Sequence, residues 1–312
     1  MIPRLFNQIK NISYPSDIDI LICSCGYEER CTYFASQFVL SDIPSKLVYK
    51  FNSPSDDRIA KHESFFKEKG FEIYKTEDDA QKWIREPFLD HLKKYIGKKT
   101  DLKVAIDISS MTRSWYAALM KTITQYDMPY SKIYCYYYYV ESIQKRNKQL
   151  SSLTVQPIPG YSNIVVPEKP TALIIGMGNM SEVVNYLVEY FSAERVYCFY
   201  NSDKGSSLNK AEVTKWFYYD VHDLAHAFMD LWDLCKSLVN DYRIMVVPCG
   251  PKPFTLVSLL LNYILREVEI WKVGPLHSEE DRNTEATSDV IQLEILYISN
   301  KQAMIEENEK QK

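Results

Sequence analysis

The sequence predicts an α/β protein made of two tandem units, and three observations lead to that prediction. Runs rich in Val, Ile and Tyr, typical of strands, alternate along the chain with runs of helical periodicity. The strand-like runs show little polar alternation, which is typical of a parallel sheet covered by helices on both faces. The same order of elements then occurs a second time, which indicates an internal duplication. We expect two Rossmann-like units, each with a mainly parallel sheet of five or six strands flanked by helices.

Both halves of the chain open in the same way. A strand, a glycine turn and a helix are predicted by DIDILICSCGYEER (17–30) and again by KPTALIIGMGNMSE (169–182). The next strand ends in both halves in an aromatic residue followed by Asn and Ser, as KLVYKFNS (46–53) and as RVYCFYNS (195–202). A third strand follows in each half and leads into a long amphipathic helix. The third strands are FEIYKTEDD (71–79) and WFYYDVHD (216–223).

The fourth strand of each half leads into a helix through a short junction. In the first half this junction ends at Arg113, and Lys252 holds the matching place in the second half. An apolar helix and a fifth strand then follow in both halves. The fourth strands with their junctions are DLKVAIDISSMTR (101–113) and DYRIMVVPCGPKP (241–253), the helices cover 114–126 and 254–266, and the fifth strands are KIYCYYYYV (132–140) and EVEIWKV (267–273).

A proline-rich segment between the two halves predicts the domain boundary. We expect a first unit over residues 1–150, a linker over 151–168, and a second unit over 169–300. One further strand, DVIQLEILYI (289–298), is expected to belong to the second unit. The charged end of the chain, 301–312, is expected to be a tail.

Composition and charge narrow the class of protein. Hydrophobic residues make up 46% and charged residues 25% of the 312 residues, which is typical of a globular chain. The net charge is −4, so no general basic field favours duplex DNA or RNA. The seven cysteines include no CxxC pair and the histidines form no HExxH pattern, so we expect no metal site, no disulfide framework and a cytoplasmic location. No segment is apolar over the length that a membrane span needs, so no membrane partner is expected.

The candidate ligand site lies where the strands are predicted to end. In an open α/β sheet, ligands bind beyond the carboxyl ends of the strands. Small or hydroxyl residues before a helix leave backbone N–H groups free for a phosphate, and the basic residue that opens the helix adds charge pairing. The alternative is capping, in which Ser110 or Thr112 only caps the helix. The candidate ligand-binding residues are Gly26, Asn52, Ser109, Ser110 and Thr112 in the first half, and Gly178, Asn201, Gly250 and Lys252 in the second.

A bound dinucleotide cofactor is not expected. Gly176-x-Gly178-x-x-Ser181 lacks the last glycine of the dinucleotide fingerprint, and Asn201 stands where the acid that binds the ribose is expected. We therefore interpret these glycines as residues that allow a tight strand-to-helix turn.

Four charged residues of the first half are candidates for catalysis. Asp107 could act as a base, bind a ribose hydroxyl, or form an ion pair with Arg113 or Arg30. Glu29 and Arg30 are expected on the first turn of a helix, where an arginine opposes the helix dipole. The second half has neither this acid nor this arginine, so any catalysis is expected in the first half. The candidate catalytic residues are Asp107, Arg113, Glu29 and Arg30.

The junction after the fourth strand resembles a known sequence motif. In the CRISPR-associated Rossmann fold (CARF) sensor domains, a DxTGGTK-like loop lies at the ligand pocket. Asp107 to Arg113 is similar to that loop, with Ser110 and Met111 in place of its two glycines, and Gly250-Pro251-Lys252 is similar to a shortened version. Two such units in one chain resemble the SAVED sensors of prokaryotic antiviral systems.

The resemblance implies a cyclic oligonucleotide ligand, or a related nucleotide, in a cleft between the two halves. It also implies an effector protein as partner and, in some members, metal-independent cleavage of the ring, for which Ser109, Thr112 and Arg113 would be positioned. Three hypotheses stay open from the sequence. The chain is a nucleotide sensor, an enzyme that acts on a nucleotide or a nucleic-acid end, or an interaction subunit that has lost its ligand. The sequence also leaves a homodimer open.

Overall fold

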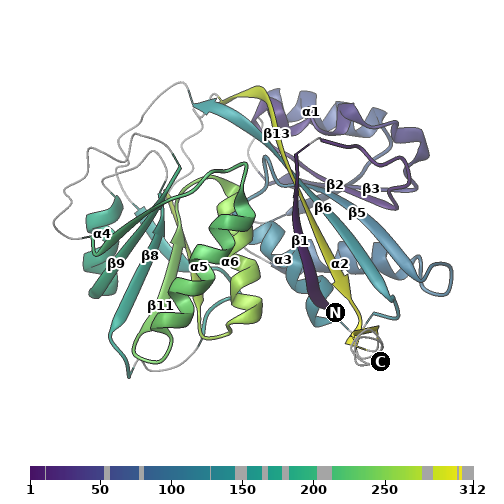
Figure 1. Ribbon diagram of the computed structural model, residues 1–312. Coiled ribbons are helices and arrows are strands. Elements are labelled where there is room, and N and C mark those ends of the chain that lie inside the picture. The colour runs from purple at the N-terminus through teal and green to yellow at the C-terminus, as the bar shows by residue number, and fades with distance from the viewer. Residues whose placement is uncertain are drawn as a thin grey trace. The chain divides into compact units, whose positions relative to one another are not determined.

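The computed structural model divides the chain into two compact units (Figure 1). Unit 1 is Met1–Lys148 together with Glu280–Lys312, and unit 2 is Gln149–Glu279. None of the described helices is long and apolar enough to cross a membrane. The structure describes residues 1–10, 12–52, 57–76, 81–126, 128–144, 153–163, 168–177, 183–201, 213–275, 284–300 and 302–303.

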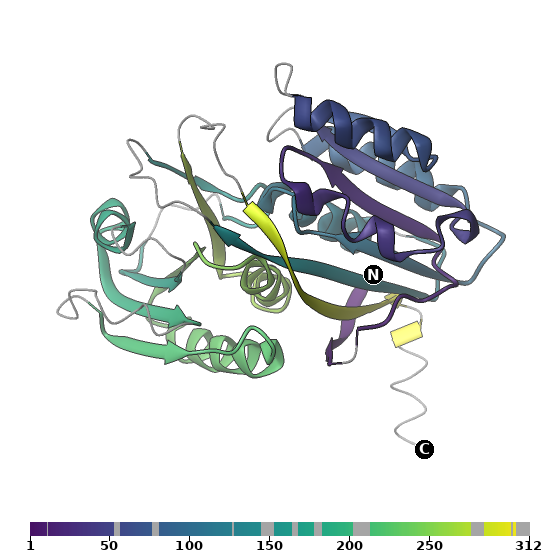
Figure 2. The same ribbon diagram turned by 90° about the horizontal axis from the view of Figure 1, so that it is seen from above.

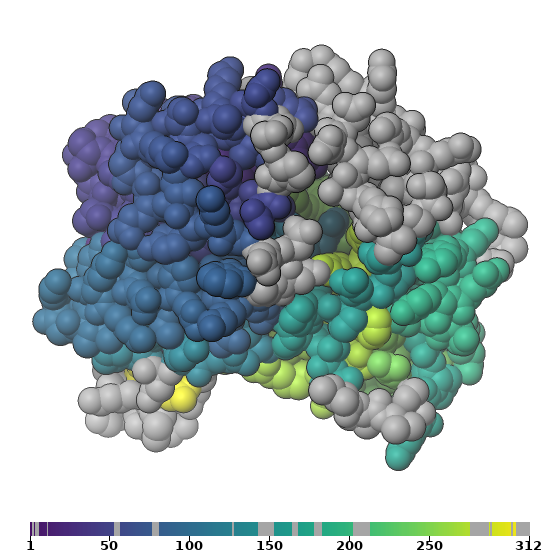
Figure 3. All heavy atoms as spheres, turned by 180° about the vertical axis from the view of Figure 1, so that it is seen from behind, coloured from purple at the N-terminus to yellow at the C-terminus, as the bar shows by residue number. Residues whose placement is uncertain are grey.

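Unit 1 contains a seven-stranded sheet with the order β1-β13-β6-β5-β2-β3-β4. The strands from β6 to β4 in this order are parallel, whereas β13 is antiparallel to both of its neighbours. The blue atoms of unit 1 in Figure 3 include those of α1 and α2, as the colour bar shows by residue number. The strands are β1 (Ile2–Ile9), β2 (Ile20–Cys25), β3 (Ser45–Phe51), β4 (Glu72–Thr76), β5 (Asp101–Asp107), β6 (Lys132–Gln144) and β13 (Thr284–Ile298), and the helices are α1 (Asp57–Glu68), α2 (Gln81–Lys93) and α3 (Arg113–Gln125).

Unit 2 contains a six-stranded sheet with the order β10-β9-β8-β11-β12-β7. All its neighbouring strands are parallel except β7, which is antiparallel to β12. The strands are β7 (Leu153–Pro157), β8 (Thr171–Gly176), β9 (Ala193–Tyr200), β10 (Lys215–Tyr218), β11 (Arg243–Pro248) and β12 (Glu269–Pro275), and the helices are α4 (Val183–Phe191), α5 (Leu224–Leu238) and α6 (Lys252–Ile264).

The predicted α/β fold is confirmed, and both units arrange their five parallel strands alike. The sheets read β4-β3-β2-β5-β6 and β10-β9-β8-β11-β12, which is the same spatial order of third, second, first, fourth and fifth strand. The central strands β2 and β8 are buried along nearly their whole length, as expected for parallel strands with helices on both faces. The expected five or six strands describe unit 2, whereas unit 1 has β1 in addition.

The predicted domain boundaries are wrong at both ends of unit 2. The strand expected at 289–298 in the second unit is part of β13, which pairs with β6 and β1 of unit 1 (Figure 2). Residues 153–157, expected in the linker, form β7 at the edge of the sheet of unit 2. The alternating apolar residues Ile291, Leu293 and Ile295 are buried, but their pattern does not specify which strand lies beside β13. Each unit therefore receives its antiparallel strand from the segment that follows the other unit's fifth strand.

The expected helix after the first strand is also absent from the described residues. Residues 29–42 form the 3₁₀-helices η1 (Glu29–Cys31), η2 (Ala35–Gln37) and η3 (Leu40–Asp42). Hydroxyl groups compete here for the carbonyls that an α-helix would use, because Thr32 Oγ1 donates to Glu29 O and Ser36 Oγ donates to Tyr33 O. Glu29 and Arg30 consequently lie on a single 3₁₀ turn rather than at the start of a helix.

Candidate functional site

The candidate site of unit 1 lies at the carboxyl ends of β2 and β5. These strands are neighbours, and the chain continues from them to opposite sides of the sheet, through β3 on one side and β6 on the other. Such a switch in strand order is where open α/β sheets bind ligands. The segments that begin here are residues 26–30 after β2 and residues 108–112 between β5 and α3. We call residues 108–112 the β5–α3 loop.

Asp107 fixes the conformation of the β5–α3 loop through hydrogen bonds to Ser109. Its side chain is fully buried, and Oδ1 accepts hydrogen bonds from Ser109 N at 2.8 Å and from Ser109 Oγ. A carboxylate that accepts the N–H two residues ahead forms an Asx turn, which fixes the direction of the chain. The loop is also tied to β6, because Ile108 N donates to Tyr138 O at 2.9 Å and Val140 N donates to Ser109 Oγ at 2.9 Å. Asp107 and Ser109 therefore hold the loop in one conformation.

The next helix, α3, begins with a hydroxyl cap and a cation. Thr112 is the N-cap residue, and its Oγ1 accepts a hydrogen bond from Trp115 N at 3.3 Å. Of the two residues expected as alternatives for capping, Thr112 is the one that caps. The first turn carries no acidic residue, and the half-buried Arg113 opens it. A cation is unfavourable beside the positive end of a helix dipole, and a bound anion would reverse that sign.

Three buried hydroxyl groups at this site have no hydrogen-bond partner among the described residues. They belong to Ser24 near the end of β2, to Ser110 in the β5–α3 loop, and to Ser114 in the first turn of α3. Their exposed fractions are 0%, 7% and 1%. A buried hydroxyl without a partner costs about 1–3 kcal/mol, so most native structures avoid it. Buried hydroxyls without partners at the point where the strand order switches indicate a site at which a ligand provides the missing hydrogen bonds.

Arg30 is held by groups other than Asp107. Its side chain is 4% exposed, with Nε and Nη2 at 3.2 and 3.3 Å from the two carboxylate oxygens of Glu28. Nη1 donates to Val140 O at 2.8 Å, and the guanidinium lies 5.5 Å from the ring centre of Tyr139. Burial would lower the pKa of Arg30, but the Glu28 carboxylate and Tyr139 raise it above its ordinary value. The ion pair of Arg30 with Asp107, one of the alternatives given by the sequence, does not form, and Arg30 pairs with Glu28 instead.

The cysteines around Asp107 are unsuited to nucleophilic chemistry. Burial raises the pKa of the Cys23 thiol well above its ordinary value, and the nearby Asp107 carboxylate raises it further. Burial has the same effect on the pKa of Cys31. Since the thiolate is the reactive form, these side chains act as small apolar groups of the core. Among the described residues, no group of three or more His, Cys, Asp or Glu side chains could hold a metal ion.

The other sequence-predicted residues of unit 1 lie around this site. The carbonyl of Gly26 lies 2.8 Å from His62 Nδ1, and a Cβ at Gly26 would lie 3.3 Å from the ring of Phe51. Asn52 directly follows β3, is exposed, and donates its N–H to Thr76 O. Glu29 is exposed on η1. Catalytic roles for Asp107, Arg113, Glu29 and Arg30 stay predictions, and two of these four side chains are deeply buried.

The matching site of unit 2 is built differently. Residues 249–251 alone join β11 to α6, and Cys249 N donates to Gly176 O at 2.7 Å. A Cβ at Gly250 would lie 2.2 Å from Met177 O, so the two backbones touch. Lys252 opens α6 after Pro251, which provides no side-chain cap. Asn201 directly follows β9 and is half-buried, and Gly178 lies outside the described residues.

No family model matches this sequence, and a search of curated proteins finds no match. Sequence reasoning missed Ser24, Ser114 and the pairing of Glu28 with Arg30. Ser114 is the first residue of the predicted helix, and its hydroxyl at this position was the signal that could have identified it as a site residue.

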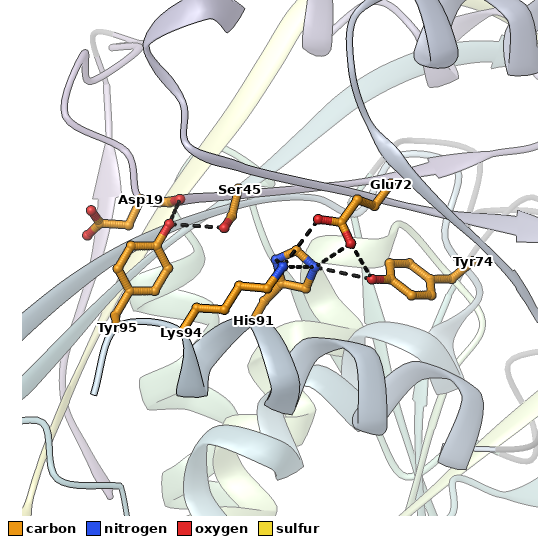
Figure 4. A network of polar contacts seen from close by, with 7 residues as sticks. All are labelled: Asp19, Ser45, Glu72, Tyr74, His91, Lys94 and Tyr95. Atoms are coloured by element: carbon orange, nitrogen blue, oxygen red, sulfur yellow. Dashed lines mark hydrogen bonds and ion pairs between the residues drawn. The ribbon is translucent and has the colours of Figure 1, made fainter. Parts of the chain in front are cut away.

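A second polar cluster lies at the opposite edge of the same sheet (Figure 4). Glu72 begins β4, and its carboxylate accepts hydrogen bonds from Tyr74 Oη at 2.7 Å and from Lys94 Nζ at 3.2 Å. His91 Nε2 lies 3.2 Å from both Tyr74 Oη and Glu72 Oε2. Beside it, Tyr95 Oη donates to Asp19 O and Ser45 Oγ, at the starts of β2 and β3. Because this is the amino edge of the parallel strands, we interpret the cluster as structural.

His91 is expected to make the stability of unit 1 fall below about pH 6.5. Its side chain is 1% exposed, and burial lowers its pKa. The Glu72 carboxylate opposes this shift, while the Lys94 ammonium, 3.2–3.3 Å from both ring nitrogens, adds to it. The nearby Asp90 also opposes it. The unfolded chain therefore binds a proton at His91 that the folded chain does not. The contribution of His91 to the free energy of unfolding is fully present above the pKa of the unfolded state and is lost as the pH falls below it.

Urea unfolding between pH 7.5 and 5.5 measures this effect. Substituting His91→Gln should flatten the dependence of the unfolding midpoint on pH, whatever it does to the midpoint at neutral pH. An equally steep dependence in the variant would show that other groups cause it.

Proposed function

We propose that unit 1 binds a phosphate-bearing nucleotide at the β5–α3 loop and the first turn of α3, and that the protein is a nucleotide sensor. The observation that carries the proposal is the pair of buried hydroxyls without partners, Ser110 and Ser114, beside a helix N-terminus. Helix N–H groups and hydroxyls are the donors that phosphate oxygens accept. Arg113, at the same place, supplies the charge that the protein as a whole lacks, since its net charge is −4.

The position of Asp107 favours a binding site over a catalytic site. Asp107 uses one carboxylate oxygen to hold Ser109, and it is fully buried beneath the loop. A general base must reach the proton that it removes, which a loop-ordering carboxylate is badly placed to do. The sensor proposal needs only hydrogen-bond donors that are gathered at the loop and the first turn of α3, as in other phosphate sites.

The ligand class follows from the resemblance of residues 107–113 to the CARF loop. A cyclic oligonucleotide, as bound by those sensors, presents several phosphates and fits a site made of serine hydroxyls, helix N–H groups and one arginine. On this proposal the protein acts in prokaryotic antiviral defence and passes the signal to an effector protein. The shorter β11–α6 connection of unit 2, packed on Met177, makes unit 1 the stronger candidate for the phosphate.

Nucleotide binding is tested first without any assumption about the ligand. Freshly purified protein is precipitated with acid, and the supernatant is examined for absorbance at the wavelength of nucleobases. Binding of cyclic and linear oligoadenylates is then measured by calorimetry. We expect Arg113→Glu to weaken the binding by about tenfold or more, since it replaces a charge-assisted contact by repulsion.

The matched control is Lys61→Glu, which makes the same change of charge at an exposed position on α1. This variant should bind as the wild type does. Equal losses of affinity in both variants would show that the effect comes from the overall charge and not from a contact of Arg113. An absence of binding to every probe, with no nucleotide released, would contradict the proposal. Shorter products in the same incubations would favour the enzyme alternative at Asp107 and Arg113.

A further inference from the structure

Beyond the β5–α3 loop, β6 continues past the end of its neighbour. Strand β5 ends with Asp107 opposite Tyr138, whereas β6 runs on to Gln144 and is paired there with β13 (Figure 2). The pairing extends from Tyr139 opposite Ile291 to Gln144 opposite Thr284. We call residues 139–144 and 284–291 the arm. On the side where β5 has ended, no strand of the described residues pairs with the arm.

At the base of the arm, side chains take the place of the missing strand. The N–H of Val140 donates to Ser109 Oγ at 2.9 Å, and the carbonyl of Val140 accepts from Arg30 Nη1 at 2.8 Å. Both groups are buried, so each bond replaces one that a neighbouring strand would otherwise supply. Ser109 belongs to the proposed ligand loop. The first residues of the arm are thus held by the loop that would contact the ligand.

The arm also carries both covalent connections to unit 2. The chain leaves unit 1 after Lys148, shortly after β6 ends at Gln144, and returns to it at Glu280, shortly before β13 begins at Thr284. Everything in unit 2 lies between these two points of the sequence. A change in the order of the arm therefore acts on both covalent connections at once.

We infer that ligand binding at the β5–α3 loop changes the order of the β6–β13 arm. Ser109 and Arg30 are the residues that couple the loop to the arm. The inference rests on the proposed function for its ligand. A phosphate bound at Ser110 moves the backbone on which Ser109 lies, and Ser109 Oγ is the acceptor for Val140. Ligand binding at the loop and the order of the arm are then coupled through this hydrogen bond.

Hydrogen exchange of the ligand-free, full-length protein tests the coupling, so the result does not depend on whether a nucleotide binds. We expect Ser109→Ala to speed the exchange of peptides from the arm by about fivefold or more, because the N–H of Val140 loses its acceptor. The variant also removes the hydrogen bond from Ser109 Oγ to Asp107 Oδ1 within the loop. Ser110→Ala is the matched control, because the Ser110 hydroxyl makes no hydrogen bond to the described residues. Its arm should exchange as in the wild type.

The site of the effect separates coupling from general destabilisation. Faster exchange in the arm but not in β3 and β4 supports the inference, whereas faster exchange throughout unit 1 contradicts it, as does an unchanged arm in Ser109→Ala. Should that variant fail to fold, Arg30→Lys provides the same test. A lysine keeps the charge beside Glu28 but cannot at the same time donate to Val140 O as the guanidinium does. An arm that exchanges normally in Arg30→Lys would overturn the inference.

Discussion

The substitution Arg30→Met is expected to lower the free energy of unfolding by about 3–5 kcal/mol, the usual cost of breaking a buried ion pair by removing one partner. Arg30 is 4% exposed and donates to Glu28 and to Val140 O. Without the guanidinium, the Glu28 carboxylate, whose side chain is 13% exposed, loses its cation, and a buried carbonyl loses its donor. Methionine fills a similar volume, so the effect comes from charge and hydrogen bonding rather than from a cavity.

A double-mutant cycle with Glu28→Gln isolates the ion pair. The double variant should lose less stability than Arg30→Met alone, because it also removes the carboxylate charge with which Arg30 pairs. Urea unfolding followed by circular dichroism gives the midpoints and slopes, with the exposed Arg266→Met as the control for the loss of an arginine. A cost for Arg30→Met no larger than for the control would mean that the Glu28 carboxylate is solvated, and that Arg30 contributes little to the base of the arm.

The parallel core of each unit could be predicted from the sequence, because burial on both faces leaves a clear pattern. Strands β2 and β8 are nearly all apolar, and a glycine follows β2 and ends β8. The comparison of the two halves then gave the order of the elements. What the pattern could not give was the neighbour of β13. Ile291, Leu293 and Ile295 would suit any apolar strand beside them, and β12, which precedes them in the chain, is not the one they join.

The site could be predicted in position more readily than in detail. A junction of hydroxyl residues after an apolar strand located the β5–α3 loop, and Thr112 caps α3 as one of the stated alternatives. The partner of Arg30 could not be predicted, because its position depends on the 3₁₀ turn of η1 and on the carbonyl of Val140, more than a hundred residues away. The sequence around Arg30 does not indicate a contact with a residue so far along the chain.

Gly250→Ala is expected to destabilise unit 2 by about 3 kcal/mol, at the upper end of the range for overpacking. The added Cβ would lie 2.2 Å from Met177 O and 3.0 Å from Met177 C, and both are backbone atoms that cannot turn away. The neighbouring bond from Cys249 N to Gly176 O holds the same two segments together. The methyl group must therefore push the β11–α6 connection away from the end of β8.

Thermal unfolding compares this variant with Gly274→Ala, where the nearest atom to the new Cβ is Thr154 Oγ1 at 3.9 Å. That control should unfold close to the wild type, whereas Gly250→Ala should unfold about 6–12 °C lower. The contact of Gly250 with Met177 is what distinguishes the second site from the first, where the longer β5–α3 loop presents Ser110 instead. Wild-type unfolding of Gly250→Ala would mean that this connection moves easily, and the matched site of unit 2 would then be as accessible to a phosphate as that of unit 1.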